Sequence, residues 1–244
     1  MNVLVEIVLL GTIAGVVGTG IGGLFAYIFK NPSKIFLSIT MGLAGGIMLS
    51  IVCFDMLPEA FSLVSFKVSI LGIILGCLVI NQLDNVTESV QENHRSHDTY
   101  YKTGIMLLCA IAMHNLPEGL AIGSGFGVNV HLGLSLCFII MLHNIPEGMV
   151  IAASLSAGGM KAVKILGLAA LAGAPMGLGA LIGGVLGNIS SLLIALCLSF
   201  AAGAMLFIIV SELIPKSNYL YSKKISGFSI ILGFLFGIIL SLVL

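Results

Sequence analysis

Eight long apolar segments take up almost the whole chain, and they constrain its fold more than any other feature. Their expected bounds are about 3–29, 33–61, 66–83, 103–127, 130–157, 162–187, 190–215 and 225–244. Each is near or above the ~20 residues that a helix needs to cross a bilayer. Only 8% of the 244 residues are charged, too few to solvate the surface of a soluble protein of this size. The sequence therefore predicts an all-α polytopic membrane protein with eight transmembrane helices, held in a lipid bilayer.

The basic residues indicate how the segments are oriented. Nine of the ten lie in or beside odd-numbered connections, and Lys67 is the exception; the nine are Lys30, Lys34, Arg95, Lys102, Lys161, Lys164, Lys216, Lys223 and Lys224. The positive-inside rule assigns that side to the cytoplasm. We therefore expect both termini outside and the polar loop 84–102 in the cytoplasm. The compact chain shows no targeting segment, which favours a bacterial cytoplasmic (inner) membrane.

The second and seventh segments resemble each other. The sequence GIML at 46–49 recurs as GAML at 203–206, and at the same spacing Asp55 matches Glu212. A proline follows each acid by three residues. Because the two segments would cross the membrane in opposite directions, the pattern predicts an inverted repeat. That architecture is common in secondary transporters.

A six-residue motif is written twice inside apolar segments, as HNLPEG at 114–119 and as HNIPEG at 143–148. In each copy His and Glu are four residues apart, so both side chains lie on one helical face. An acid at the centre of a bilayer costs roughly 2.5–3.5 kcal/mol, so such residues are rare and usually functional. Imidazole and carboxylate together suit a borderline divalent metal such as zinc. The motifs therefore predict one shared metal site.

Three residues outside the motifs are weaker candidates for the metal pathway. Met48 lies deep in the second segment, where core packing competes with a role as a thioether ligand. Asp55 and Glu212 end the second and seventh segments, where placement at the membrane interface explains them equally well.

The twin motifs and the eight segments resemble the ZIP (Zrt/Irt-like) family of divalent metal transporters, in particular its bacterial members. The resemblance covers the whole chain. It implies a single transporter domain over 1–244 that takes up zinc into the cytoplasm, with Fe²⁺, Mn²⁺, Cd²⁺ and Co²⁺ as further candidate substrates and no resident cofactor. It also implies a 3+2+3 arrangement, in which two three-helix bundles related by inversion flank spans four and five. The oligomeric state stays open, with a homodimer as one alternative.

The resemblance further implies a binuclear metal centre. One metal position would be formed by His114, Glu118, His143 and Glu147. The other would be formed by Asn115 and Asn144, with the two glutamates bridging. Many family members complete the second position with a Glu before a Pro in the sixth span. Here that place is held by Ala174 before Pro175, so we expect the second position to be weaker.

Two other functions stay open at the level of the sequence. One is an intramembrane zinc hydrolase with Glu118 or Glu147 as general base, although the chain has no HExxH motif. The other is a proton-linked carrier of organic solutes that uses the same His and Glu residues as a relay. A net charge of zero gives no sign of nucleic-acid binding.

Overall fold

The computed structural model describes residues 3–28, 32–92 and 99–244, with side chains described outside 84–92 and 99–103. Within these residues the secondary structure is helical, without strands. The elements are α1 (Val3–Ile28), α2 (Lys34–Ile51), η1 (Val52–Met56), α3 (Leu57–Leu63), α4 (Phe66–Glu92), α5 (Thr99–Val128), α6 (Val130–Ala157), α7 (Ala162–Gly173), α8 (Pro175–Gly187), α9 (Ser191–Ile208), η2 (Ile209–Leu213), α10 (Ile214–Leu220) and α11 (Lys223–Val243).

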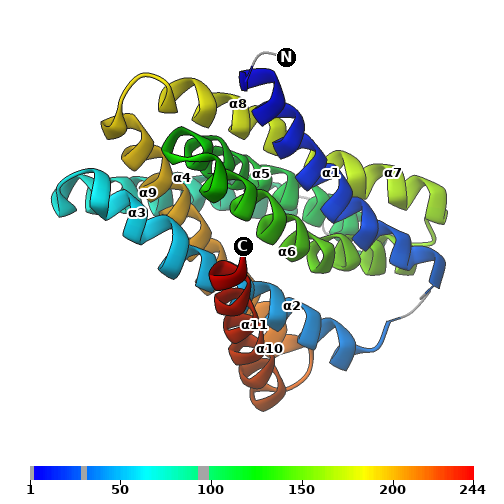
Figure 1. Ribbon diagram of the computed structural model, residues 1–244. Coiled ribbons are helices and arrows are strands. Elements are labelled where there is room, and N and C mark those ends of the chain that lie inside the picture. The colour runs from blue at the N-terminus through cyan, green and yellow to red at the C-terminus, as the bar shows by residue number, and fades with distance from the viewer. Residues whose placement is uncertain (1–2, 29–31, 93–98) are drawn as a thin grey trace.

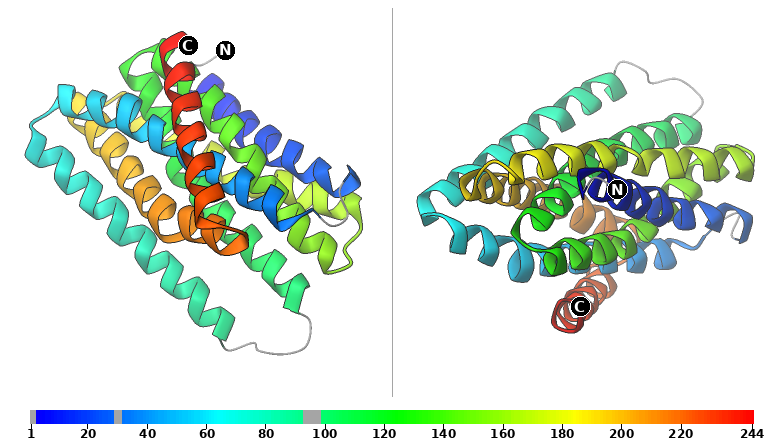
Figure 2. Two further views of the ribbon diagram at one scale, coloured as in Figure 1. Left: turned by 90° about the horizontal axis from the view of Figure 1, so that it is seen from below. Right: turned by 45° about the horizontal axis from the view of Figure 1, so that its top comes forward.

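These helices form eight spans that are long and apolar enough to cross a membrane, so the predicted all-α membrane fold is confirmed. The second span joins α2, η1 and α3, the sixth joins α7 and α8, and the seventh joins α9, η2 and α10. The start of α1 and the end of α11 lie at the same end of the molecule, as an even number of crossings requires (Figure 2).

The helix ends differ from the expected ones by more than two residues at two places in the chain. The polar segment 84–102 is largely helical, because α4 continues to Glu92 and α5 begins at Thr99. Residues 93–98 of the expected loop lie outside the described residues. The seventh span continues past the expected end at 215 and reaches Leu220. Its hydropathy falls at Lys216, but the helix accommodates this lysine by pairing it with Glu212 one turn earlier.

The second and seventh spans have the same secondary structure, residue by residue. Each has an 18-residue α-helix, a five-residue π-helix and a seven-residue α-helix. All three elements recur at a spacing of 157 residues, from 34 to 191, from 52 to 209 and from 57 to 214. Asp55 and Glu212 occupy the same place in the two π-helices. A π-helix re-aims the side chains around it and is frequent at functional sites. These shared elements support the internal repeat.

The helices pack as two groups of four spans (Figures 1 and 2). The first group contains spans one, four, five and six, in which α1 packs on α6, α7 and α8, and α5 packs on α8 and α6. The second group contains spans two, three, seven and eight, in which α2 packs on α11 and α4 packs on α9. The two groups meet mainly where α5 contacts α9 and where α2 contacts α6.

The expected 3+2+3 arrangement is not confirmed by this packing. Among the described residues α1 has no substantial contact with α2 or α4, so the first three spans do not pack as a bundle. Helices of one half pack instead on helices of the other half, as α2 does on α11 and α4 does on α9. An inverted repeat allows this packing, because the contact of the second span with the eighth has its equivalent in the contact of the seventh span with the third.

Candidate metal site

The two copies of the motif lie on neighbouring helices, α5 and α6, close to the line where the two groups of spans meet. Pro117 and Pro146 lie inside these helices, and both helices continue through them. A proline leaves one backbone carbonyl without its usual helical donor, which is tolerated in membranes only inside protein or beside a polar cavity. All six predicted ligands are buried, with exposed fractions of at most 3%: His114, Asn115, Glu118, His143, Asn144 and Glu147.

Three of these side chains converge, and we refer to Glu118, His143 and Glu147 as the ligand trio. One potential ligand atom from each lies within 4.8 Å of the others. His143 Nε2 lies 3.1 Å from Glu118 Oε1 and 3.5 Å from Glu147 Oε1. Two ligand atoms at a tetrahedral zinc are about 3.4 Å apart when each bond is about 2.1 Å long. The two distances from His143 are therefore close to those between ligands of one zinc ion, and the shorter of them is also a hydrogen bond between His143 and Glu118.

The second carboxylate oxygen of each glutamate in the trio supports the interpretation as a metal site. Glu118 Oε2 and Glu147 Oε2 are both buried, and neither has a hydrogen-bond partner among the described residues. Buried polar atoms are normally paired, and a buried carboxylate without a partner is costly. Two such oxygens within one site indicate that a cation bound between the helices would supply the missing interaction.

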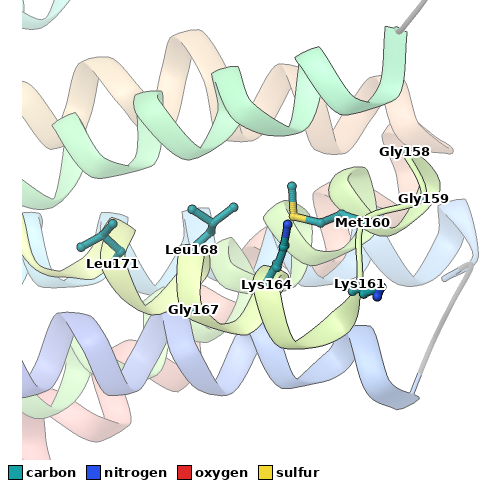
Figure 3. A pocket seen from close by; sticks show the side chains of 8 residues that line it. All are labelled: Gly158, Gly159, Met160, Lys161, Lys164, Gly167, Leu168 and Leu171. Carbon is teal, nitrogen blue, oxygen red and sulfur yellow. The ribbon is translucent and has the colours of Figure 1, made fainter.

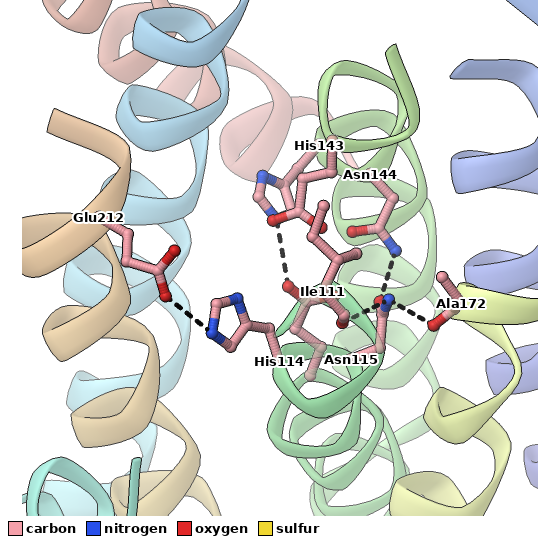
Figure 4. Close-up of polar contacts among 9 residues, drawn as sticks. Ile111, His114, Asn115, His143, Asn144, Ala172 and Glu212 are labelled. Atoms are coloured by element: carbon pink, nitrogen blue, oxygen red, sulfur yellow. Dashed lines mark hydrogen bonds and ion pairs between the residues drawn. The ribbon is translucent and has the colours of Figure 1, made fainter. Parts of the chain in front are cut away.

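His114 is turned away from the trio. Its Nε2 lies 3.0 Å from Glu212 Oε1 (Figure 4). The other oxygen of Glu212 pairs with Lys216. Glu212 was predicted only as a weaker pathway residue, yet it contacts a motif histidine directly. The sequence signal that could have raised its rank is its match to Asp55 in the repeat. A polar chain thus runs from the motif to the partly exposed Lys216.

The two motif asparagines bond to each other. Asn144 Nδ2 donates to Asn115 Oδ1 over 3.1 Å, while Asn115 Nδ2 donates to the carbonyls of Ile111 and Ala172 at 3.0 and 2.9 Å (Figure 4). The amide oxygen of Asn115 is therefore used by another amide. Ala172 belongs to α7, two residues before Ala174, which stands where the family resemblance implies an acid in many members. The two asparagines predicted for a second metal position therefore bond to each other and to backbone carbonyls, while Asn144 Oδ1 has no partner among the described residues.

The remaining candidates lie on the second span. Met48 is completely buried within the main hydrophobic core, so the packing role is the better supported one. It lies one turn after Ala44, whose backbone faces His143. Asp55 is partly buried, and its Oδ1 accepts a hydrogen bond from Ser241 Oγ at 2.6 Å. Neither residue belongs to the ligand trio.

The glycine that ends each motif was not assigned a role from the sequence. Gly119 lies against the backbone of Met176 in α8, and Gly148 lies against the backbone of Thr19 in α1. A Cβ at either position would collide with that backbone. Each glycine therefore brings a neighbouring helix close to the motif glutamate that precedes it.

A second hollow lies apart from the motif, at the turn between α6 and α7 (Figure 3). It is lined by Gly158, Gly159, Met160, Lys161, Lys164, Gly167, Leu168 and Leu171. Its described lining contains two lysines and no carboxylate, so its charge would repel a metal cation. The buried motif is the better candidate for a metal site.

Comparison with known proteins identifies the family of the chain. The profile of the ZIP zinc transporters matches residues 84–244, which include both motifs. The chain belongs to the ZIP family. The zinc transporter GufA of Myxococcus xanthus is 34% identical over 175 residues, which cover 70% of this chain and 69% of GufA. The zinc transporters ZupT of Streptococcus mutans and Escherichia coli are 28% and 32% identical, over 93% and 91% of both chains.

Membership of the ZIP family fits an integral membrane protein that transports ions and is not an enzyme. The intramembrane hydrolase that the sequence also allowed is not supported. The family assignment rests on both the motif region and the full set of spans, because the ZupT relatives align over nearly the whole chain.

Proposed function

We propose that this ZIP-family chain carries zinc through the membrane into the cytoplasm, with Glu118, His143 and Glu147 as its central binding site. The observation that supports this most strongly is the spacing of the three buried ligand atoms, together with the two carboxylate oxygens that lack protein partners. The relatives named as zinc transporters support zinc as the transported ion.

The chemistry of the trio favours zinc over harder cations. Two carboxylates balance the two charges of the ion, and one imidazole adds a nitrogen ligand that magnesium and calcium rarely use. A fourth ligand would come from water or from His114 after its side chain turns from Glu212. Iron, manganese, cadmium and cobalt share parts of this ligand preference, so we propose them as secondary substrates.

Transport requires that the site open to one side of the membrane at a time. The ligand trio lies on α5 and α6, in the first group of spans, whereas Glu212 belongs to the second group. We propose that the two groups shift against each other during transport, in the way that inverted repeats support in other carriers. The contact between His114 and Glu212 crosses this boundary and would change as the groups move.

Uptake of radioactive zinc into proteoliposomes tests this function. We expect accumulation of zinc inside the vesicles, with excess magnesium failing to compete. An intramembrane hydrolase would give no accumulation, and an organic-solute carrier would not require metal. Failure of zinc to accumulate in vesicles that contain inserted protein would refute the proposal.

Topology provides a second test. The basic residues predict that residue 96 lies in the cytoplasm and that His131, in the first turn of α6, lies outside. In a cysteine-free background, Ser96→Cys should resist an impermeant thiol reagent in intact cells and react after permeabilisation. His131→Cys is the control and should react from outside in both cases. The reverse pattern would overturn the proposed direction of the spans.

Metal stoichiometry provides a third test. Because Asn115 and Asn144 bond to each other and Ala174 supplies no acid, we expect one tightly bound zinc per chain. Ala174→Glu should create a second tight position, measured by mass spectrometry of the metal in purified protein. Ala174→Gln has the same size without the charge and should leave one zinc. Two equally tight zinc ions in the unmodified protein would contradict this expectation.

A further inference from the structure

A lysine lies in the seventh span, next to the polar chain that begins at the motif. Lys216 Nζ pairs with Glu212 Oε2, while Glu212 Oε1 lies 3.0 Å from His114 Nε2. The side chain of Glu212 is 15% exposed and that of Lys216 is 40% exposed. Glu212 is therefore shared between a buried histidine of the metal motif and a cation nearer the surface.

The internal repeat relates Glu212 and Lys216 to positions on the second span that have a different charge pattern. The spacing of 157 residues matches Glu212 with Asp55 and Lys216 with Glu59. Asp55 Oδ1 accepts from Ser241 Oγ, and its buried Oδ2 has no partner among the described residues. The second span therefore carries two acids at the positions where the seventh span carries an acid and a base.

We propose that Lys216 is a tethered cation that competes with the transported metal for Glu212. This inference rests on the proposed function, because it concerns the release of the same ion. A metal that leaves the ligand trio toward Glu212 meets a carboxylate whose second oxygen is already held by the ammonium. The positive charge of Lys216 also repels the dication, so the ion is not retained there.

The difference between the two ends gives the pathway a preferred direction of release. Asp55 and Glu59 attract cations at one end, and neither is described as paired with a basic side chain. Glu212 attracts them less at the other end because Lys216 neutralises it. The proposed topology puts Lys216 on the cytoplasmic side, so Lys216 would favour release into the cell.

The test is to remove the charge of Lys216 while keeping its length, as Lys216→Met. Zinc should bind about three- to tenfold more tightly to the purified variant, as expected for loss of a partly exposed ion pair and of its repulsion of the metal. The maximal rate of zinc uptake into proteoliposomes should fall by a similar factor, and the KM should fall with it. Lys216→Arg keeps the charge, so its zinc affinity, maximal uptake rate and KM should match those of the unmodified protein.

Two further variants make the result specific. Lys164→Met removes an exposed lysine that lies outside the polar chain, and it should leave binding and uptake unchanged. Glu59→Lys places a lysine at the repeat position that matches Lys216, beside Asp55, and should raise the KM for zinc. If Lys216→Met binds and transports zinc like the unmodified protein, or if Lys216→Arg fails to restore it, the inference is wrong. If the unmodified protein neither binds nor transports zinc, the proposed function itself is wrong.

Discussion

Removing both carboxylates of the ligand trio, in the double variant Glu118→Ala, Glu147→Ala, should abolish zinc uptake. Each glutamate is buried, and each has an oxygen with no partner among the described residues. The double variant leaves only His143 from the trio, without any charge to balance zinc. Loss of supporting residues around a metal site already costs about 10–100-fold in affinity, so loss of two direct ligands should exceed that. The measurement is the initial rate of zinc-65 uptake into proteoliposomes, normalised to the amount of inserted protein.

The controls separate loss of ligands from loss of fold. Glu118→Gln with Glu147→Gln keeps the size of both side chains and removes their charge, and it should be equally inactive. Glu6→Ala removes an exposed acid from the first turn of α1 and should transport normally. Both double variants should remain monodisperse in detergent, because each removes two buried carboxylates whose second oxygens have no partner among the described residues, which relieves a cost to folding. Full uptake by the double alanine variant would mean that the motif is structural and that the proposed site is wrong.

The sequence predicted the spans well and their packing poorly, for a physical reason. A span is decided locally, by about twenty consecutive apolar residues, so the eight segments could be located from composition alone. Which helices touch is decided by surface shape over long distances in the chain. No local pattern indicated that α2 packs on α11 or that α4 packs on α9. The family resemblance predicted a 3+2+3 order of spans along the chain, but it did not predict that the spans pack as two groups of four.

In the candidate site, too, the features set by local spacing could be predicted and those set by packing could not. The four-residue spacing of His and Glu placed both on one face of each helix, and that was sufficient to predict Glu118, His143 and Glu147 together. The π-helices could not be predicted, because they depend on an extra residue that the surrounding packing accommodates. The η2 segment holds Glu212 where it lies 3.0 Å from His114. For that reason the sequence alone did not place Glu212 beside His114, and the assignment of His114 as a metal ligand stays a prediction.

Adding a single methyl group at Gly148 should destabilise the protein and reduce transport. Gly148 follows Glu147 in the motif, at the point where α6 crosses α1, and a Cβ there would meet the Thr19 carbonyl and the Cα of Gly22. Alanine favours a helix by about 1 kcal/mol over glycine, so helix propensity alone would make Gly148→Ala stabilising. Overpacking typically costs 1–3 kcal/mol, and here the obstacle is backbone, which cannot rotate away. We therefore expect a net loss of stability and a displaced Glu147.

Gly167→Ala in α7 is the matched control, because a Cβ at Gly167 would meet nothing within 4 Å. Its melting temperature should stay the same or rise slightly, whereas that of Gly148→Ala should fall by several degrees, since about 1 kcal/mol corresponds to roughly 2–4 °C in a protein of this size. Thermal unfolding of both purified variants and their zinc uptake are the measurements. If α1 and α6 pack as closely as the structure shows, the melting temperature falls for Gly148→Ala and does not fall for Gly167→Ala. Equal melting temperatures for Gly148→Ala and Gly167→Ala would mean that the helices can separate at this crossing, and that the position of Glu147 does not depend on it.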